Sequence, residues 1–361
     1  MKKIRVGIIG QGRSGRNIHR NMFTTMAALQ ERFEVVAVAD YIAERRKYPG
    51  AVEGPDFLST DNYKEILARK DIDLVVNATR SMDHIPVSIE CLQAGKNVIC
   101  EKPIARCVAD IEKLEKAIAE SGRFFAPFQQ SRFRPLFRKT MEVMNSGILG
   151  RIIMVKVAYN GYGRRWDWQT LQEMHGGELL NTGPHPMDQV VQFLGEKFPE
   201  NIHCVMDRVN TAGDAENHVK ILLHGKDIPT IDVEISQCCM FPGNTYEIYG
   251  SKGGLKAAGN TVTWRYFKPE YEAPLRIERE PLETEGRLPC YCSEEVKYYD
   301  ESWTAPTSTS GMNFWGECYY REVYDALVNG KPMQINLDQV KTQVRIIEEC
   351  HRQNPLPPLE K

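Results

Sequence analysis

The sequence has no long apolar run, no internal repeat and no large charge of one sign. No stretch approaches the ~20 consecutive apolar residues that a membrane-spanning helix needs. The formal net charge is -2 over 361 residues, so neither nucleic acid nor an anionic membrane is indicated as a partner. We therefore expect a soluble globular chain that binds no nucleic acid and no membrane.

Cysteine pairs with the spacing of metal ligands are also lacking. The ten cysteines are scattered, and the N-terminal apolar stretch is too short and too glycine-rich for a secretory signal, so we expect reduced thiols in a cytoplasm. The close pairs Cys238-Cys239 and Cys290-x-Cys292 do not have zinc-site spacing, and no second pair lies at a matching distance. We expect them to fill the core or loops, and we expect no bound metal.

What is present is a globular composition long enough for two domains. Hydrophobic residues make up 42% and charged residues 26%, which argues against disorder. In the first ~125 residues apolar strands alternate with helices, which predicts an α/β fold with a doubly wound parallel sheet. The predicted strands are Ile4 to Ile9, Val35 to Ala39, Leu74 to Ala78, Asn97 to Cys100 and Phe124 to Phe128. The predicted helices are Arg13 to Gln30, a short one capped by Asp61 through Leu67, Pro86 to Leu92, and Val108 to Glu120.

After Phe128 the pattern changes to that of an α+β domain with a mostly antiparallel open sheet. We therefore place one domain, with the doubly wound sheet, at 1–128 and a second, α+β domain at 129–361, with the last helix able to pack back on the first domain. Its predicted helices are Pro135 to Ser146, Tyr319 to Asn329 and Leu337 to Arg352, and its predicted strands are Ile152 to Tyr159, His218 to Leu223, Thr230 to Gln237 and Tyr246 to Tyr249. We expect a long loop over Glu283 to Met312 and a loose tail from Pro355.

A glycine loop follows the first strand and opens the first helix. The segment Gly10-Gln11-Gly12-Arg13-Ser14-Gly15 is a G-x-G-x-x-G, whose glycines permit a tight turn, close approach to a pyrophosphate and close helix packing. This context predicts that the first domain is a dinucleotide-binding Rossmann domain, and we expect the second domain to bind the substrate and to form the oligomer. The same letters alone could be a plain strand–helix turn. Asp40 ends the second strand, where a carboxylate accepts ribose hydroxyls and repels a 2′-phosphate, so we expect NAD. Arg45 and Arg46 could neutralise a phosphate, but we interpret them as solvated charges on the next helix.

A second candidate site is Glu101-Lys102-Pro103 at the C-terminal end of a predicted parallel strand. Doubly wound folds bind their ligands at this edge of the sheet. A lysine there can lie beside the nicotinamide and hydrogen-bond a substrate oxygen. The tripeptide by itself is unremarkable, so the prediction depends on its location.

Several segments together resemble the glucose-fructose oxidoreductase / inositol dehydrogenase / MocA (Gfo/Idh/MocA) family over nearly the whole chain. Besides the glycine loop and Asn77-Ala78-Thr79 with His84, they are Ala94-Gly95-Lys96-Asn97-Val98-Ile99-Cys100-Glu101-Lys102-Pro103, Arg132-Phe133-Arg134-Pro135, Gly176-Gly177-Glu178-Leu179-Leu180-Asn181-Thr182-Gly183-Pro184-His185-Pro186-Met187-Asp188 and Tyr249-Gly250-Ser251-Lys252-Gly253-Gly254. In this order they are very specific.

The resemblance implies roles for individual residues. Lys102 would bridge a substrate hydroxyl and the nicotinamide ribose, with Glu101 near the same ribose, and Pro103 would follow a cis peptide bond. Asn181 and His185 match the catalytic Asp-x-Gly-x-His element, and their i, i+4 spacing puts both on one face if this segment is helical. The residues implied to line the cofactor are Asn77, Ala78, Thr79, His84 and Gln130.

Asn181 is a departure from the family pattern, because inositol dehydrogenases carry aspartate at this position. The asparagine resembles the sugar-oxidising branch of the family. An asparagine can orient His185 and bond a substrate hydroxyl, but it cannot stabilise an imidazolium by charge. The identity of the catalytic base therefore stays open, and an inositol-type dehydrogenase remains an alternative.

Other residues near the catalytic element have two interpretations each. Arg132 either binds substrate or pairs with a carboxylate, and Asp188 is either a helix residue or a supporting one. The segment from Tyr162 to Trp168, with Trp166 and the basic Arg164 and Arg165, could cover a sugar ring or pack at a subunit interface. The tyrosines and Trp303 of the predicted 283–312 loop could similarly lie beside the pocket or in an oligomer contact.

These observations together predict an NAD-dependent oxidation of a secondary hydroxyl on a sugar or glycoside, with C3 favoured. His185 would act as general base near its natural pKa, and Lys102 would stabilise the developing alkoxide. An alternative is a glycosidase that retains NAD and acts by transient oxidation and elimination. A non-catalytic NAD sensor is disfavoured, because Lys102 and His185 are both present. We expect a homo-oligomer, either a dimer or a tetramer.

Overall fold

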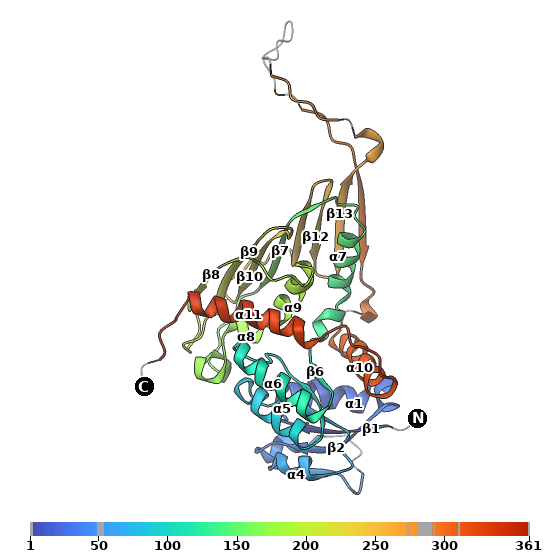
Figure 1. The fold of residues 1–361 in the computed structure, drawn as a ribbon, viewed down its shortest axis with the longest axis vertical. Coiled ribbons are helices and arrows are strands. Elements are labelled where there is room, and N and C mark those ends of the chain that lie inside the picture. The colour runs from blue at the N-terminus through green and yellow to red at the C-terminus, as the bar shows by residue number, and fades with distance from the viewer. Residues whose placement is uncertain are drawn as a thin grey trace.

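The computed structural model describes residues 3–48, 54–272, 274–279, 291, 293–309 and 311–359. The chain forms two β-sheets, each with helices packed against it, and Figure 1 shows the second sheet above the first. The first sheet is parallel and the second is mostly antiparallel, as the sequence predicts. No helix in the described part of the chain is long and apolar enough to cross a membrane.

The first sheet has six parallel strands in the order β3-β2-β1-β4-β5-β6. The strand order reverses between β1 and β4, and the carboxyl ends of the strands beside such a switch point form the ligand-binding edge of a doubly wound sheet. Its strands are β1 (Ile4–Ile9), β2 (Phe33–Ala39), β3 (Leu58–Thr60), β4 (Leu74–Asn77), β5 (Asn97–Cys100) and β6 (Phe125–Pro127). The short edge strand β3 is the one that the sequence does not predict.

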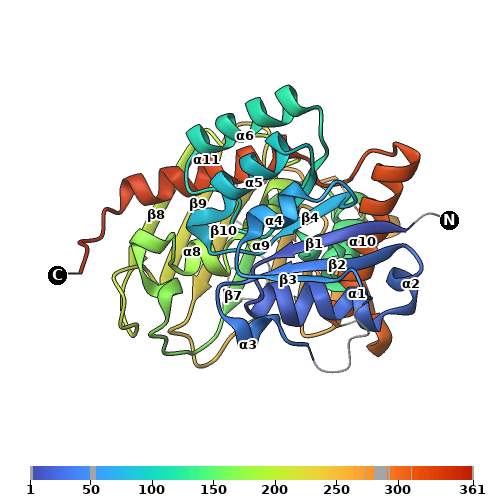
Figure 2. The ribbon, with the colours of Figure 1, turned by 90° about the horizontal axis from the view of Figure 1, so that it is seen from below.

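Helices cover both faces of this sheet (Figure 2). One face carries α1 (Asn21–Thr25) and α2 (Ala27–Gln30), and the core on the other face includes side chains of α4 (Tyr63–Ala68), α5 (His84–Gln93) and α6 (Val108–Ser121). The short α3 (Ala43–Arg46) follows β2. The cap of α4 is Asn62, whose side chain accepts from Lys64 N, so the prediction of Asp61 as the cap is wrong by one residue.

The helical stretch predicted for Arg13 to Gln30 is present but is interrupted at one residue. The segment is helical from Arg13, has π-helical geometry over Gly15–Arg20, continues as α1, and breaks at Met26, whose backbone is extended. Thr24 and Thr25 donate their hydroxyl groups to the carbonyl oxygens of Arg20 and Asn21. Such hydroxyl bonds to the preceding turn compete with the helical pattern and commonly bend helices.

The second sheet has eight strands in the order β14-β13-β12-β11-β7-β10-β9-β8. The pair β10 and β7 is parallel and its other pairs are antiparallel. Its strands are β7 (Ile152–Asn160), β8 (Asn201–Asp207), β9 (His218–His224), β10 (Thr230–Ser236), β11 (Tyr246–Gly250), β12 (Gly253–Ala258), β13 (Thr261–Phe267) and β14 (Tyr298–Thr304). One face packs on α7 (Pro135–Asn145) and α9 (Pro184–Phe193), and the other face is open.

The strands β8, β12, β13 and β14 are missing from the sequence-based prediction. The prediction of a loop through Glu283 to Met312 is wrong over β14, because an edge strand with exposed side chains lacks the apolar alternation that marks half-buried strands. Residues 280–290, with Cys290, and also Cys292, lie outside the described residues. Cys238 and Cys239 lie within them as free thiols.

The end of the chain packs against both sheets. The helix α10 (Met312–Asn329) buries Tyr319, Tyr320 and Val323 against the first sheet and begins seven residues before the predicted Tyr319. The helix α11 (Leu337–Gln353) lies along the junction in Figure 1, with Val340 and Val344 in the first core and Ile346 and Ile347 in the second. Within residues 355–359 the tail is tied to the second domain rather than loose as predicted, because Leu356 O and Leu359 N bond to Gln172 and Asp214.

Candidate active site

The glycine loop at the end of β1 has the geometry that a dinucleotide requires. Gly10 has a φ of 86°, and a Cβ there would lie 2.2 Å from the carbonyl oxygen of Ala78. A Cβ on Gly15 would lie 1.8 Å from Gly10 O, so both positions exclude a side chain. A Cβ on Gly12 would meet nothing within 4 Å, which leaves open space where a pyrophosphate could approach the backbone. The residues therefore fit the predicted cofactor.

Asp40 is a buried carboxylate beside this loop, at the end of β2. Its two oxygens accept hydrogen bonds from Gln11 N at 2.7 Å and Ile42 N at 2.8 Å, which fixes the orientation of the carboxylate. The remaining lone pairs can accept ribose hydroxyls. Arg45 is exposed, as expected, whereas Arg46 is half-buried and donates to the carbonyl oxygen of Asp40 at 2.5 Å. The interpretation of Arg46 as a solvated charge is therefore wrong.

The last residue of β4, Asn77, is hydrogen-bonded to the residues that follow the strand. Asn77 is fully buried, donates to His84 O at 2.9 Å and Ser88 Oγ at 3.0 Å, and accepts from Thr79 Oγ1 at 2.7 Å. His84 lies 2.6 Å from the carbonyl oxygen of Pro103 through Nδ1, and burial lowers the pKa of its imidazole. Asn77 and His84 therefore hold the turns in place, while Thr79 remains half-exposed at the surface of the site.

Lys102 lies at the carboxyl end of β5, and its peptide bond to Pro103 is cis, as the resemblance implies. Its Nζ donates to the carbonyl oxygen of Asn181 at 2.6 Å, which joins the two predicted catalytic segments. Burial lowers the pKa of Lys102 below its usual range, while the carboxylates of Glu101 and Glu178 act in the opposite direction. An ammonium group has three N–H donors, so two remain for a substrate oxygen or a ribose.

Asn181 and His185 belong to two successive helices rather than to one. Asn181 ends α8 (Glu178–Asn181) and His185 is the second residue of α9, and the intervening Thr182 and Gly183 keep helical dihedral angles. Asn181 and His185 therefore still lie one helical turn apart, as their spacing predicts. However, no hydrogen bond joins the Asn181 amide to the His185 ring among the described residues, so Asn181 does not orient the imidazole here.

His185 has no hydrogen-bond partner for its ring among the described residues. Within the part of the chain that the structure describes, neither ring nitrogen forms a hydrogen bond, and Nδ1 is wholly buried. Burial and the nearby Lys102 ammonium lower the pKa of His185 to about 3. The expectation of a natural pKa is therefore wrong. At neutral pH the imidazole is uncharged and able to accept a proton.

Arg132 pairs with a carboxylate. Its Nε and Nη2 donate to the two carboxylate oxygens of Asp188 at 2.7 and 2.6 Å, and both side chains are buried. Nη2 also donates to Gln339 Oε1 of α11. This two-pronged pair uses Nε and Nη2 of the guanidinium and matches the carboxylate-pairing interpretation, whereas the role of Arg132 as a substrate ligand stays a prediction.

The predicted substrate loop exposes its aromatic rings. Tyr162 is 52% exposed and Trp166 is 81% exposed, so both rings have free faces. Arg165 pairs with Asp167 at 2.9 Å and lines a small hollow together with Glu178, the first residue of α8, which locates this loop beside the predicted catalytic element. Gln130 is buried next to α10, where its Nε2 contacts Met312 Sδ at 3.3 Å and its Oε1 lacks a partner among the described residues.

Two buried carboxylates at the N-terminal end of α8 are missing from the sequence-based prediction. Glu178 accepts from Gln237 Nε2 at 3.0 Å, and Glu216 accepts from the backbone N–H of Leu179 at 3.0 Å. Burial raises the pKa of Glu216 to about 7. A Cβ on Gly177 would lie 2.3 Å from Glu216, which explains the glycine before the helix. The sequence signal is weak, because isolated glutamates are usually exposed.

Family comparisons cover most of the chain in two parts. A model of an oxidoreductase family with an NAD-binding Rossmann fold matches residues 4–128, and a model of the GFO/IDH/MocA C-terminal domain matches residues 137–256. These two parts correspond to the first sheet with its helices and to the larger part of the second sheet.

Curated relatives share low identity with this chain over much of its length. A scyllo-inositol 2-dehydrogenase (NADP(+)) of Bacillus subtilis is 22% identical over 96% of this chain and 92% of its own. A 2,7-anhydro-N-acetylneuraminate hydratase of Mediterraneibacter gnavus is 27% identical over 71% of this chain and 67% of its own. The crystal structure of an NAD-binding protein from Listeria innocua has a TM-score of 0.77 at 20% identity, covering 99% of this chain and 100% of that one, which shows the same fold.

Proposed function

This chain belongs to the Gfo/Idh/MocA family of NAD-binding oxidoreductases, and we propose that it interconverts a secondary hydroxyl and a ketone on a sugar or glycoside. One observation carries the proposal. His185, without a protein partner among the described residues, lies one helical turn after Asn181, whose carbonyl oxygen accepts from Lys102 Nζ at 2.6 Å, and the Lys102 ammonium lowers the pKa of the imidazole. An unpaired base beside a fixed ammonium is the arrangement that alcohol oxidation needs.

The two side chains divide the chemistry of the hydroxyl group. The imidazole of His185 accepts the hydroxyl proton, and the Lys102 ammonium stabilises the oxygen as negative charge develops on it. The nicotinamide, when bound, supplies hydride acceptance and donation at the carbon. Asn181 keeps Lys102 in place through its carbonyl oxygen at 2.6 Å, and its side-chain amide remains available to a substrate hydroxyl.

We propose NAD rather than NADP as the preferred cofactor. The support is Asp40, whose buried carboxylate is held by two backbone amides where the adenosine ribose would bind. The negative charge of Asp40 would repel the 2′-phosphate of NADP at this position. The Bacillus subtilis relative is named as an NADP(+) enzyme, so the preference is a property to be measured for this chain.

We propose a sugar or glycoside oxidised at C3 as the substrate. The exposed rings of Tyr162 and Trp166 support this, because aromatic faces can cover the apolar face of a pyranose. The test is incubation with NAD and glucose, simple glucosides or inositols, followed by trapping of the carbonyl and its location by NMR. A 3-oxo product supports the proposal, and Lys102→Ala is the matched control. Oxidation at C1, or activity only on inositols, would contradict the substrate but not the dehydrogenase assignment.

A second candidate is a reaction without net oxidation, in which NAD is retained and a glycoside is cleaved by transient oxidation and elimination. One observation favours keeping it: a relative that covers 71% of this chain is named a hydratase. Aryl glycosides distinguish the two functions. Release of the aryl group without accumulation of NADH supports the second candidate, and NADH formed in proportion to ketone supports the first.

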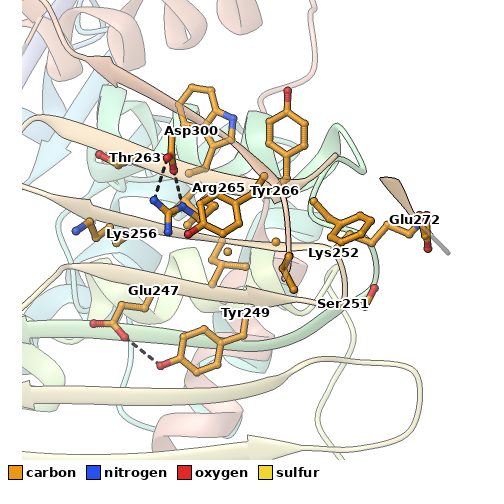
Figure 3. A pocket seen from close by; sticks show the side chains of 18 of the residues that line it. Glu247, Tyr249, Ser251, Lys252, Lys256, Thr263, Arg265, Tyr266, Glu272 and Asp300 are labelled. Atoms are coloured by element: carbon orange, nitrogen blue, oxygen red, sulfur yellow. Dashed lines mark hydrogen bonds and ion pairs between the residues drawn. The ribbon is translucent and has the colours of Figure 1, made fainter. Parts of the chain in front are cut away.

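We further propose that the chain forms a homo-oligomer through the open face of the second sheet. A hollow of about 950 Å³ lies on this face, and Figure 3 shows Tyr249, Arg265 and Asp300 among the residues that line it. The segment beyond β13 extends away from the sheet in Figure 1 and exposes Leu275 and Ile277 by 91% and 82%. Apolar side chains in such positions are typical of an interface. Light scattering after gel filtration measures the number of subunits.

We also propose that the two domains divide at residue 128 and that the protein is cytoplasmic. The first is supported by the two family models, which meet near this residue. The second is supported by the thiols, since the cysteines within the described ranges are free.

A further inference from the structure

Three buried side chains from distant parts of the chain form a continuous hydrogen-bonded row behind Lys102. Tyr320 Oη of α10 lies 2.6 Å from His19 Nδ1, and His19 Nε2 lies 3.1 Å from Glu101 Oε1. The other oxygen of Glu101 accepts from the backbone N–H of Lys102 at 3.1 Å. His19 and Tyr320 are fully buried and Glu101 is nearly so. Neither His19 nor Tyr320 is among the residues predicted from the sequence.

The row has one consistent arrangement of protons when Glu101 is ionised and His19 is neutral. The carboxylate can only accept, so His19 Nε2 carries the proton and donates it to Glu101. Nδ1 is then the acceptor, and it receives the hydroxyl proton of Tyr320. Burial alone would raise the pKa of Glu101, but the hydrogen bond from His19 and the Lys102 ammonium outweigh it and lower the pKa.

The surroundings hold the Tyr320 ring in one place. Its ring centroid lies 4.5 Å from that of Phe23 and 5.7 Å from that of Phe33, and 5.9 Å from that of Phe128. These side chains come from α1, from β2 and from the end of β6. The hydroxyl group is therefore positioned by the packing of the whole face of the first sheet, and it can fix the orientation of the His19 ring.

We propose that His19 and Tyr320 are positioning residues that keep Glu101 ionised and fixed, so that Lys102 retains its positive charge in a buried site. This inference rests on the proposed function of Lys102 in the reaction. Lys102 needs a counter-charge because burial and two nearby arginines oppose its ammonium. The charged groups that act on it are Glu101, Glu178, Arg13 and Arg165. Of the two carboxylates, Glu101 has the larger effect and is the one that His19 holds.

The first test is the pH dependence of kcat in variants of His19. In His19→Leu the buried Glu101 loses its donor and takes up a proton, so Lys102 loses a negative neighbour and gives up its own proton at lower pH. We expect the alkaline limb of the kcat profile to move to lower pH by roughly one unit. His19→Gln keeps a donor near the position of Nε2 and should restore much of the wild-type profile. Coincident alkaline limbs in His19→Leu and wild type would overturn the proposal.

The chain offers a matched pair of variants for Tyr320. Tyr319 is the neighbouring residue of α10 and is equally buried, but its hydroxyl group has no partner among the described residues. Tyr320→Phe should therefore shift the alkaline limb in the same direction as His19→Leu, and Tyr319→Phe should not. Equal effects of the two would indicate packing alone and would overturn the role of Tyr320. If His19→Leu does not fold, the comparison of Tyr320→Phe with Tyr319→Phe tests the proposal by itself.

A second readout does not depend on any enzymatic activity. Long-range 1H–15N NMR of histidine-labelled protein without substrate reports which ring nitrogen of His19 carries the proton, with His19→Gln identifying its signals. We expect protonation at Nε2, and a changed Nδ1 resonance in Tyr320→Phe but not in Tyr319→Phe. Unchanged His19 resonances in Tyr320→Phe would overturn the proposal. If the NMR result holds while no substrate is oxidised, the proposed function fails and the hydrogen-bonded row stands.

Discussion

The two sides of the candidate active site are built in opposite ways. On the side of β5, Glu101 and Lys102 have partners on two other elements, His19 of the π-helical turn and Asn181 of α8, and they also bond to each other through the backbone N–H of Lys102. On the side of α9, His185 is half-buried and both of its ring nitrogens lack partners in the described structure. Buried polar groups are ordinarily hydrogen-bonded, so an exception calls for an explanation.

We infer that the paired groups, Glu101 and Lys102, form the framework of the site, and that the unpaired His185 marks the position where a ligand binds. Groups that are already paired fix geometry and charge, and their loss should affect folding as well as activity. A group left without a partner contributes little to folding, and its loss should affect activity alone. The four predictions below test this separation, and each could show that the two sides are in fact alike.

The largest expected effect is on stability and concerns the buried pair of Arg132 and Asp188. Arg132→Ala leaves the carboxylate buried without its partner, which should cost about 3–5 kcal/mol of the free energy of unfolding. Urea denaturation measures it. The control is Arg165→Ala, which breaks a half-exposed pair with Asp167 and should cost about 1 kcal/mol or less. Equal losses in both variants would remove the distinction between framework and surface pairs.

The next effect is on catalysis. Lys102→Ala and His185→Ala should each lower kcat by roughly 10²-fold or more, because each removes a group that handles charge or a proton in the transition state. In His185→Ala the affinity for NAD and the free energy of unfolding should change far less, since the ring has no partner among the described residues. A near-normal rate in both variants would rule out the proposed mechanism.

A smaller effect is expected on cofactor preference. In Asp40→Ser the charge that opposes a 2′-phosphate is gone, so the ratio of NADPH to NADH dissociation constants should narrow by roughly tenfold, or about 1.4 kcal/mol. Titration with each cofactor, followed by fluorescence, gives the two constants. The exposed Arg45 is a suitable control, because Arg45→Ala should leave the ratio nearly unchanged. Equal or tighter binding of NADPH by the wild type would contradict the assignment to NAD.

The smallest effect is a shift of the acid limb of the pH profile. His185 must be neutral to accept a proton, and its pKa lies near 3, so activity should be lost only in strong acid. Asn181→Asp adds a negative charge that raises this pKa, so the acid limb of kcat should move to higher pH by roughly one unit. Asn181→Ala adds no charge and should not move the limb upward. An unchanged limb in Asn181→Asp would mean that position 181 does not act on His185.

Local patterns in the sequence were sufficient for the first domain and its cofactor edge. The strands β1, β2, β4 and β5 are apolar runs bounded by turns, so the local sequence reveals them. The glycine loop and Lys102 lie at the ends of β1 and β5, so their place at the ligand-binding edge follows from the predicted strands. The second domain was less predictable. Strands such as β14 expose most of their side chains, and an exposed strand has no apolar period to reveal it.

The sequence by itself determined the fold class, the family and the residue types at the site, because each depends on spacing along the chain. Only the tertiary structure decided what surrounds those residues. His19 and Tyr320 are 301 positions apart and meet beside Glu101, Arg132 finds Asp188 56 positions away, and the pKa of His185 falls through burial next to Lys102. Hydrogen-bond partners and desolvation arise from long-range packing, and packing between distant segments leaves no periodic trace in the local sequence.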